Sequence, residues 1–134
     1  MNTFPLKIVT PDGIKYDGQA EELIVRSTSG DIGILAGHVN CVAPLGMGRA
    51  TVIIDGKHRY AACIGGMLSV IDGNVSLVPT TFEWADEIDA DRAEASSRRA
   101  QAVLDRKDAS KTDILLAQAR LRRALVRKGV ANQK

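Results

Sequence analysis

The sequence predicts an antiparallel β-sandwich or β-barrel followed by a hairpin of two α-helices. Short runs rich in valine, isoleucine and threonine fill residues 4–82 and are separated by turn signals. After residue 87 the apolar residues recur at spacings of three and four, the period of an α-helix. No helical pattern interrupts the strand-like runs, which argues against a doubly wound α/β fold. We therefore expect two domains, 1–86 and 87–134.

Turn signals divide the first domain into strands. Asp-Gly pairs supply the positive φ angles that tight hairpins require. They occur within Pro-Asp-Gly at 11–13, at 17–18, at 55–56 and within Asp-Gly-Asn at 72–74, and a Ser-Gly-Asp signal lies at 29–31. The runs on either side of Asp55–Gly56 give the clearest predicted hairpin.

Two amphipathic helices are expected in the second domain. Asp89 precedes the first helix as an N-cap. Its apolar face consists mostly of small residues: Ala90, Ala93, Ser97, Ala100 and Leu104. The polar stretch 105–112 indicates a turn, after which Thr112 or Asp113 can cap the second helix. The second apolar face comprises Ile114, Ala117, Leu121, Ala124 and Leu125, and Gly129 is expected to end the helix.

Charge is distributed unevenly between the two domains. Residues 1–87 hold 6 Lys+Arg and 10 Asp+Glu, a net of −4, whereas residues 88–134 hold 12 and 6, a net of +6. A basic tail can meet nucleic acid, an anionic membrane, an acidic protein surface or a phosphate ligand. Nucleic acid is the less attractive partner because the tail lacks interleaved aromatic residues.

Motifs for catalysis are absent from the sequence. It contains no GxSxG, no HExxH and no Walker-type loop, and His38 and His58 have no nearby motif partner. Gly65-Gly66 indicates a bulge or tight bend rather than a phosphate cradle. We expect Cys41 and Cys63 to be buried free thiols in a reducing compartment. We expect no signal peptide, and any association with a membrane to be peripheral.

Arginines are placed to converge on the predicted hairpin. Arg92 and Arg99 are seven residues apart on one helical face, and Arg120, Arg123 and Arg127 share a face of the second helix. In an antiparallel hairpin Arg92 would lie near Arg123 and Arg127. Such cations repel unless water or an anion intervenes, and the guanidinium fork suits phosphate oxygens. The alternative is a solvated basic face that complements the helix dipole.

The chain resembles the epsilon subunits of bacterial F-type ATP synthases. The resemblance is carried by KIVTPDG at 7–13, SGDIGILAGH at 29–38, APLGMG at 43–48, GGMLSV at 65–70 and EIDADRA at 87–93. Their order and spacing, together with the chain length, are highly specific. The resemblance implies a β-sandwich of about ten antiparallel strands, followed by an antiparallel two-helix hairpin.

The resemblance also implies a function. Members of this family are non-catalytic subunits of the central stalk, the rotor, and couple proton translocation to ATP synthesis. The sandwich binds the gamma subunit and the c-subunit ring, with Asp31 in the loop that faces the ring. The helical arm regulates ATP hydrolysis: when extended, it approaches the catalytic beta subunits and inhibits. The complex places the subunit peripherally at the cytoplasmic face of the cell membrane.

A nucleotide site is implied by the motif (Ile/Leu)-Asp-x-x-Arg-Ala. The folded-down arm of some bacterial members binds ATP through it, as a regulatory ligand rather than a required cofactor. The matching residues here are Ile88, Asp89, Arg92 and Ala93, and the family's further ATP contacts match Glu83, Arg99, Arg123 and Arg127. Glu83 and Asp89 would accept hydrogen bonds from the base or ribose.

Two positions depart from the family pattern, and one rival function remains. Ala36 stands where the family commonly has proline, and Ser69 where it often has glutamate. The alternative function is a free-standing binding module whose basic hairpin docks acidic proteins or nucleic acid. An enzyme is a distant third hypothesis. Recovery of the gamma subunit with the tagged chain separates the first two.

Overall fold

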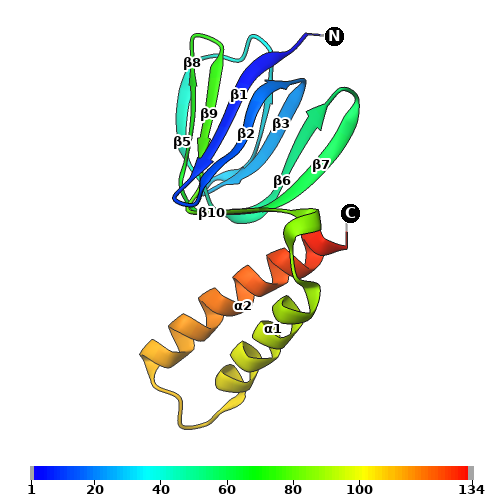
Figure 1. Cartoon of the computed structure of the whole chain (residues 1–134). Coiled ribbons are helices and arrows are strands. Elements are labelled where there is room, and N and C mark those ends of the chain that lie inside the picture. The colour runs from blue at the N-terminus through cyan, green and yellow to red at the C-terminus, as the bar shows by residue number, and fades with distance from the viewer. Residues whose placement is uncertain (1, 133–134) are drawn as a thin grey trace. The chain divides into compact units, whose positions relative to one another are not determined.

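The computed structural model describes residues 2–132 of the chain (Figure 1). Contacts between residues divide the chain into two compact units, Met1–Trp84 and Ala85–Lys134. The first unit contains ten strands and the second contains helices, as the change in sequence period at residue 87 predicts.

The first unit is a β-sandwich of two sheets. The sequence had allowed either a β-sandwich or a β-barrel, and the structure shows the sandwich. Its first sheet has the order β2 (Gly13–Ala20), β1 (Phe4–Thr10), β9 (Asn74–Val78), β8 (Met67–Ile71) and β5 (Cys41–Pro44). Its second sheet has the order β10 (Thr81–Trp84), β7 (Lys57–Ile64), β6 (Met47–Ile54), β3 (Glu22–Ser27) and β4 (Gly30–Leu35). The predicted fold class is therefore confirmed.

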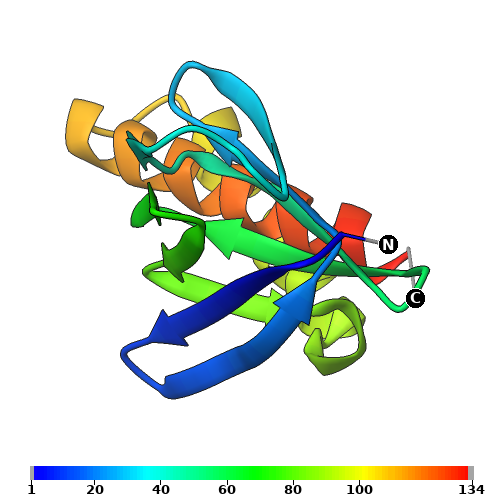
Figure 2. The same ribbon diagram turned by 90° about the horizontal axis from the view of Figure 1, so that it is seen from above.

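One strand pair departs from the antiparallel expectation. β1 and β9 run parallel, with Leu6 opposite Val75 and Ile8 opposite Leu77. These strands are far apart in the sequence, so no tight hairpin forces them to be antiparallel. The pairs that follow each other along the chain, such as β1 and β2 in Figure 2, are antiparallel hairpins.

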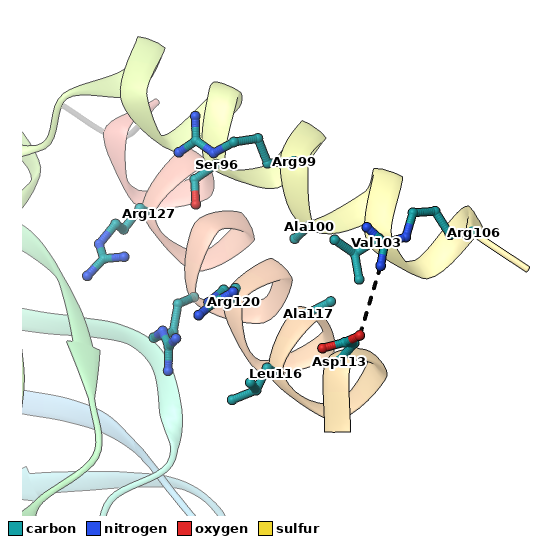
Figure 3. Close-up of a pocket in the computed structure, with 11 residues that line it drawn as sticks. Ser96, Arg99, Ala100, Val103, Arg106, Asp113, Leu116, Ala117, Arg120 and Arg127 are labelled. Atoms are coloured by element: carbon teal, nitrogen blue, oxygen red, sulfur yellow. Dashed lines mark ion pairs between the residues drawn. The ribbon is translucent and has the colours of Figure 1, made fainter. Parts of the chain in front are cut away.

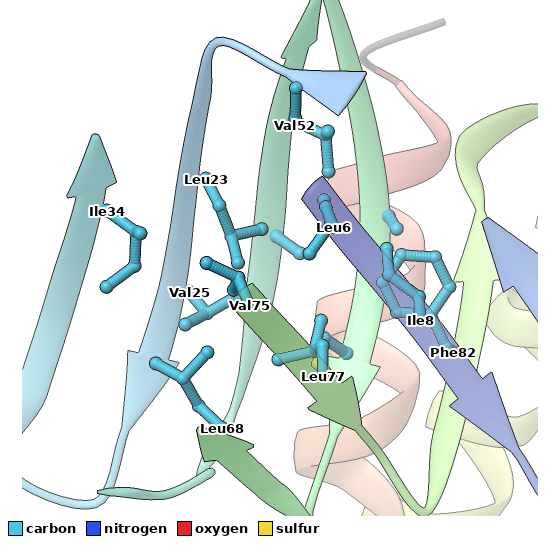
Figure 4. Packing of buried hydrophobic residues seen from close by; sticks show 14 of the residues in the cluster. Leu6, Ile8, Leu23, Val25, Ile34, Val52, Leu68, Val75, Leu77 and Phe82 are labelled. Carbon is cyan, nitrogen blue, oxygen red and sulfur yellow. The ribbon is translucent and has the colours of Figure 1, made fainter. Parts of the chain in front are cut away.

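Aliphatic side chains from both sheets fill the core (Figure 4). Along β1 the buried residues alternate with exposed ones, so that Phe4, Leu6 and Ile8 point inward. Phe82 and Trp84 add an edge-to-face pair with ring centroids 4.9 Å apart. Leu68 and Leu77 come from the first sheet and Leu23, Val25 and Val52 from the second. The low aromatic content of the sequence is thus matched by an aliphatic core.

Three of the four Asp-Gly signals lie at tight turns, and the one at 17–18 does not. The first belongs to the turn between β1 and β2, in which Thr10 pairs with Gly13. Asp55 and Asp72 have φ angles of 51° and 50°, and the glycines that follow them also have positive φ. Two such residues in succession fit a type I′ hairpin turn. The expected turn at 17–18 is wrong, because these residues lie inside β2 and Gly18 pairs with Leu6. The Tyr16 side chain occupies the space beside Gly18, so glycine is used there for packing.

Gly65-Gly66 forms the tight bend that the sequence predicts. Both glycines have positive φ, 67° and 100°. A Cβ atom on Gly66 would overlap the carbonyl oxygen of Val78 and lie 2.5 Å from the Cα of Pro79. Only glycine fits this close approach between two backbones.

The second unit is a helical hairpin with a short entry. It comprises the 3₁₀ turn η1 (Ala85–Glu87) and the helices α1 (Ala90–Asp105) and α2 (Lys111–Ala131). The expected N-cap at Asp89 is confirmed, since its carboxylate accepts a hydrogen bond from the Arg92 backbone amide at 3.0 Å.

Three details of α2 differ from the expectations. Its N-cap is Ser110, not Thr112 or Asp113, because Ser110 and Asp113 form a reciprocal capping box. Gly129 does not end the helix, which continues to Ala131. Leu125, expected on the apolar face, is 50% exposed.

Both cysteines are free thiols, but only Cys63 is fully buried. Burial raises the pKa of Cys63 to about 12, because an apolar environment disfavours the thiolate. Cys41, at the start of the edge strand β5, is partly exposed, so the expectation of two buried thiols holds for one of them. A strand at the edge of a sheet has a neighbour on one side only, which leaves its side chains less covered.

Replacing Gly66 by alanine should destabilise the sandwich strongly. We compare Gly66→Ala with Gly30→Ala, since both glycines have positive φ but only Gly66 faces another backbone within contact distance. Gly30→Ala should cost only backbone strain, about 1–3 kcal/mol, whereas Gly66→Ala adds a steric clash and should cost about 2 kcal/mol more. Denaturant unfolding of both variants measures the difference. Equal destabilisation would show that the close approach at Gly66 is not a constraint.

Candidate anion-binding site between the two helices

Small side chains bring α1 and α2 together. On α1 the buried positions are Ala93, Ser97 and Ala100, and on α2 they include Ala117 and Ala124. Small residues at the contact permit a short distance between helix axes. The Ser97 hydroxyl donates to the Glu94 carbonyl oxygen at 2.8 Å, which satisfies a polar group that would otherwise be buried unpaired.

Two ion pairs join the helical segments and mark how α1 and α2 are aligned along each other. At one end, Glu94 on α1 pairs with Lys128 on α2 and also accepts from Arg98 Nε at 3.1 Å. At the other end, Arg106 lies 3.9 Å from Asp113 (Figure 3). The hydrogen bond from Lys128 holds the pKa of Glu94 below its usual range, with Arg98 contributing in the same direction.

A pocket of about 570 Å³ opens between these two ion pairs. All of its lining residues belong to the helical unit, so the hairpin alone defines it (Figure 3). The lining comprises Ser96, Arg99, Ala100, Val103 and Arg106 from the α1 side and Asp113, Leu116, Ala117, Arg120, Arg123 and Arg127 from α2.

The lining is strongly basic. It carries five arginines and one carboxylate, that of Asp113. Asp113 is already engaged, because it pairs with Arg106 and its side chain accepts from the Ser110 backbone amide at 3.4 Å. For Arg99, Arg120 and Arg123 the lining offers no other carboxylate. A group of like charges around a concave surface favours the binding of an anion.

The structure brings three of the expected nucleotide-site residues into this pocket. Arg99, Arg123 and Arg127 all line it. Arg92 lies on the same face of α1, one heptad before Arg99, and is outside the lining. The predicted convergence of arginines is thus centred on Arg99 rather than on Arg92.

The other expected nucleotide-site residues occupy different positions. Asp89 is the N-cap of α1, while Ile88 and Ala93 are buried, each 4% exposed. Glu83 lies on β10, in the sandwich unit. These placements leave the nucleotide role of the four residues a prediction.

Two arginines of the pocket were not among the expected site residues. Arg106 follows Arg99 by seven residues, and Arg120 precedes Arg127 by seven. This heptad spacing keeps side chains on one helical face and was the available sequence signal. The alignment of the two helices decides which arginines meet, and it cannot be read from either helix alone.

Asp31, the expected ring-contact residue, lies on β4 at the tip of the β3–β4 hairpin. It is opposite Arg26 in the strand register, and the Arg26 Nε lies 3.2 Å from its carboxylate. The Asp31 side chain is 62% exposed, so it remains accessible while paired. Arg26 in turn packs over Gly48, where a Cβ atom would lie 2.7 Å from the Arg26 Cβ.

Apolar side chains form a row across the outer face of the first sheet. Pro44 pairs with Met67, Met67 with Val78, and Val9 with Ile14. Val9 and Val78 follow directly after the paired residues Ile8 and Leu77. The row therefore crosses all five strands, and we call it the outer apolar row. Its members Ile14, Met67 and Val78 are exposed, which is typical of a protein–protein contact surface.

Neither a metal centre nor a membrane span is found in residues 2–132. Within that range no three histidine, cysteine or acidic side chains are grouped so that they could hold an ion. Neither α1 nor α2, nor any other described helix, is long and apolar enough to cross a bilayer.

Two family models together match nearly the whole chain. The model described as ATP synthase, Delta/Epsilon chain, beta-sandwich domain matches residues 3–85. The model described as ATP synthase, Delta/Epsilon chain, long alpha-helix domain matches residues 86–132. The boundary between the two matches lies close to the division between the structural units.

Curated relatives and solved structures agree with this match. The chain is 41% identical to an ATP synthase epsilon chain of Ruminococcus albus, with 100% of both chains covered. It is 42% identical to that of Bacillus velezensis, with 98% of each covered. Its fold is similar to a chain of the Euglena gracilis mitochondrial ATP synthase, with a TM-score of 0.84 and 21% identity over 98% of this chain and 82% of that one.

The Glu94–Lys128 pair should make the hairpin sensitive to acid. Because the pKa of Glu94 is lowered in the folded state, its stabilising contribution is present above the pKa of an unfolded glutamate and is lost as pH falls through the lowered folded value. Glu94→Gln should therefore lower the melting temperature at pH 7 but have little effect at strongly acidic pH. Circular dichroism at 222 nm measures the helical transition.

A double-mutant cycle is the control for this prediction. Lys128→Gln should have the same effect as Glu94→Gln at pH 7, and the double variant should be little worse than either alone. Additive effects of the two substitutions would contradict a direct interaction between the side chains.

Proposed function

We propose that this chain, which belongs to the ATP synthase delta/epsilon chain family, is a non-catalytic subunit of the rotor of a bacterial F-type ATP synthase. The observation that carries the proposal is the match of both units, in order and over their full length, to this family. The ATP synthase epsilon chains it resembles at about 40% identity are bacterial and equal in extent. In this role the chain transmits rotation and performs no bond chemistry.

The sandwich is proposed to dock on the gamma subunit and the c-subunit ring. The outer apolar row supports a protein contact, because an exposed apolar surface that spans a whole sheet is stabilised when a partner covers it. The β3–β4 hairpin supports a polar contact, because the Asp31 carboxylate is exposed and held in place by Arg26. A close-packed sandwich deforms little, so it can pass torque between its partners.

The helical arm is proposed to regulate ATP hydrolysis. In its hairpin form it binds ATP as a regulatory ligand, and in an extended form its basic α2 approaches the catalytic beta subunits. The pocket lined by Arg99, Arg123 and Arg127 supports anion binding. The hairpin is held by small residues and exposed ion pairs, which contribute little stability, so a change of conformation is energetically accessible.

The proposed location follows from the complex. As a rotor subunit the chain would lie at the cytoplasmic face of the cell membrane and be attached to it only through its partners. The rival function, a free-standing module that docks acidic proteins or nucleic acid, has no support from the curated relatives, which carry the name ATP synthase epsilon chain.

Disrupting the outer apolar row should release the chain from its complex. Met67→Glu places a charge in the middle of the row, where a docked partner would bury it without compensation. We expect recovery of the gamma subunit with the tagged chain to fall at least tenfold. The matched control is Leu115→Glu on α2, which changes a leucine that is 67% exposed.

The co-purification also tests the function as a whole. Failure of the unmodified chain to recover any ATP synthase subunit from its own cells would refute the rotor proposal. Equal recovery with Met67→Glu and the unmodified chain would refute only the assignment of the docking surface.

ATP should raise the melting temperature of the isolated chain. A ligand that binds only the folded form stabilises it by about 2.7 kcal/mol at one hundred times its dissociation constant. Arg123→Gln, which removes a charge from the pocket, should abolish the shift. A melting temperature that does not respond to millimolar ATP in buffer without phosphate would contradict a nucleotide-binding arm.

A further inference from the structure

We propose that Arg26 is a positioning residue, which holds the Asp31 carboxylate in the orientation in which it meets the c-subunit ring. Gly46 and Gly48 form a seat for the Arg26 side chain and keep it in place. The inference rests on the proposed function, in which the β3–β4 hairpin contacts the ring. It adds the device that prepares this contact before the partner binds.

The stem of the Arg26 side chain lies against two glycines. A Cβ atom on Gly48 would lie 2.7 Å from the Arg26 Cβ, 3.2 Å from its Cγ and 3.7 Å from its Nε. A Cβ atom on Gly46 would lie 3.4 Å from the Arg26 Cγ. Neither glycine has a positive φ, so what they supply is space rather than backbone freedom. A larger residue at position 48 would displace the arginine or the strand that carries it.

An irregularity in the pairing of β3 with β6 creates this seat. The last regular pair joins Ile24 to Thr51, and the next contact is the bridge between Ser27 and Leu45. Residues 25–26 therefore face a stretch more than twice as long, which must bulge. The bulged stretch contains both glycines and curves around the arginine.

The other end of Arg26 meets Asp31. The two residues are directly opposite in the β3–β4 register, and the Arg26 Nε lies 3.2 Å from the Asp31 Oδ1. The tip of the hairpin is fixed as well, because the Ser27 hydroxyl donates to the Gly30 carbonyl oxygen at 2.6 Å and accepts from the Ser29 amide at 3.1 Å. The guanidinium is therefore held by its seat and in turn holds the carboxylate.

Preparation for docking is the physical role of this pair. The side chains of Arg26 and Asp31 are 52% and 62% exposed, and ion pairs this exposed contribute little to stability. Ordering a side chain before it meets its partner instead removes a cost that binding would otherwise include. A carboxylate accepts hydrogen bonds, so the group that it meets on the ring is a cationic or amide donor.

Binding of the full chain to its own complex, with and without the ring, tests the role of Arg26. Arg26→Met keeps the stem but removes the donor, and it should weaken binding to the ring-containing complex about fivefold. Binding to the soluble part of the complex, which lacks the ring, should stay within about twofold. Arg26→Lys, which keeps the charge, should recover most of the loss. The matched control is Lys57→Met, which removes an equal charge from an exposed position of β7 and should leave both affinities unchanged.

A double-mutant cycle tests whether Arg26 acts through Asp31. Asp31→Asn alone should weaken binding to the ring-containing complex, and adding Arg26→Met should weaken it no further. A merely structural role of Arg26 would give additive losses and would also weaken binding to the part without the ring. Either of these results would overturn the inference.

Gly48→Ala tests the seat. The added methyl group should displace Arg26 and reproduce the effect of Arg26→Met without removing a charge. Gly18→Ala is its control, because the methyl group added there crowds Tyr16 rather than Arg26. A Gly48→Ala chain that binds the ring-containing complex as well as the unmodified chain would refute the seat. Arg26→Met, which leaves the backbone unstrained, decides the inference if Gly48→Ala does not fold.

The outcomes separate this inference from the function on which it rests. If the unmodified chain binds equally well with and without the ring, the ring contact falls and the inference falls with it. If Asp31→Asn weakens binding to the ring-containing complex but Arg26→Met does not, the ring contact stands and the role of Arg26 is refuted.

Discussion

The close contact between α1 and α2 is the constraint on which the site depends. Alanine and serine at the shared face let the helices approach, and arginines from both helices then line one pocket. Larger apolar residues would have given a more stable hairpin with wider separation. The chain instead combines weak apolar packing with crowded positive charge. An anion that offsets the repulsion between these charges would stabilise the hairpin, which is the property that the proposed ligand-controlled switch requires.

The sandwich has the opposite character. Its core is aliphatic and continuous across both sheets, and its bend at Gly65-Gly66 is fixed by a glycine at a position where another backbone leaves no room for a side chain. The surfaces proposed for partners lie on regular strands and one hairpin rather than on long loops. A rigid unit that holds its contacts is therefore joined in one chain to a unit whose structure can respond to its surroundings.

Much of this organisation was predictable because it depends on local sequence signals. The change of period at residue 87, the N-cap at Asp89 and the hairpins at Asp55 and Asp72 each follow from a few neighbouring residues. The expectations that were wrong involve competition between signals. Asp17-Gly18 is a good turn, but pairing with β1 and packing against Tyr16 keep it in a strand. Gly129 was expected to end α2, but the helix continues for two more residues, to Ala131.

The candidate site was only partly predictable for a related reason. Helical spacing identifies which arginines share a face: it groups Arg92 with Arg99, and Arg120 with Arg123 and Arg127. Of these five, all but Arg92 line the pocket. Helical spacing cannot give the alignment of two helices along each other. The pairs Glu94–Lys128 and Arg106–Asp113 mark that alignment, in which Arg99 lines the pocket and Arg92 does not.

The central claim is that a bound polyphosphate stabilises the hairpin by neutralising its crowded arginines. Hydrogen exchange of backbone amides, with and without ATP, tests this most directly because it reports local opening of each element separately. The account predicts slower exchange throughout α1 and α2 with ATP and unchanged exchange in the sandwich core. Equal exchange in the helices under both conditions would contradict it.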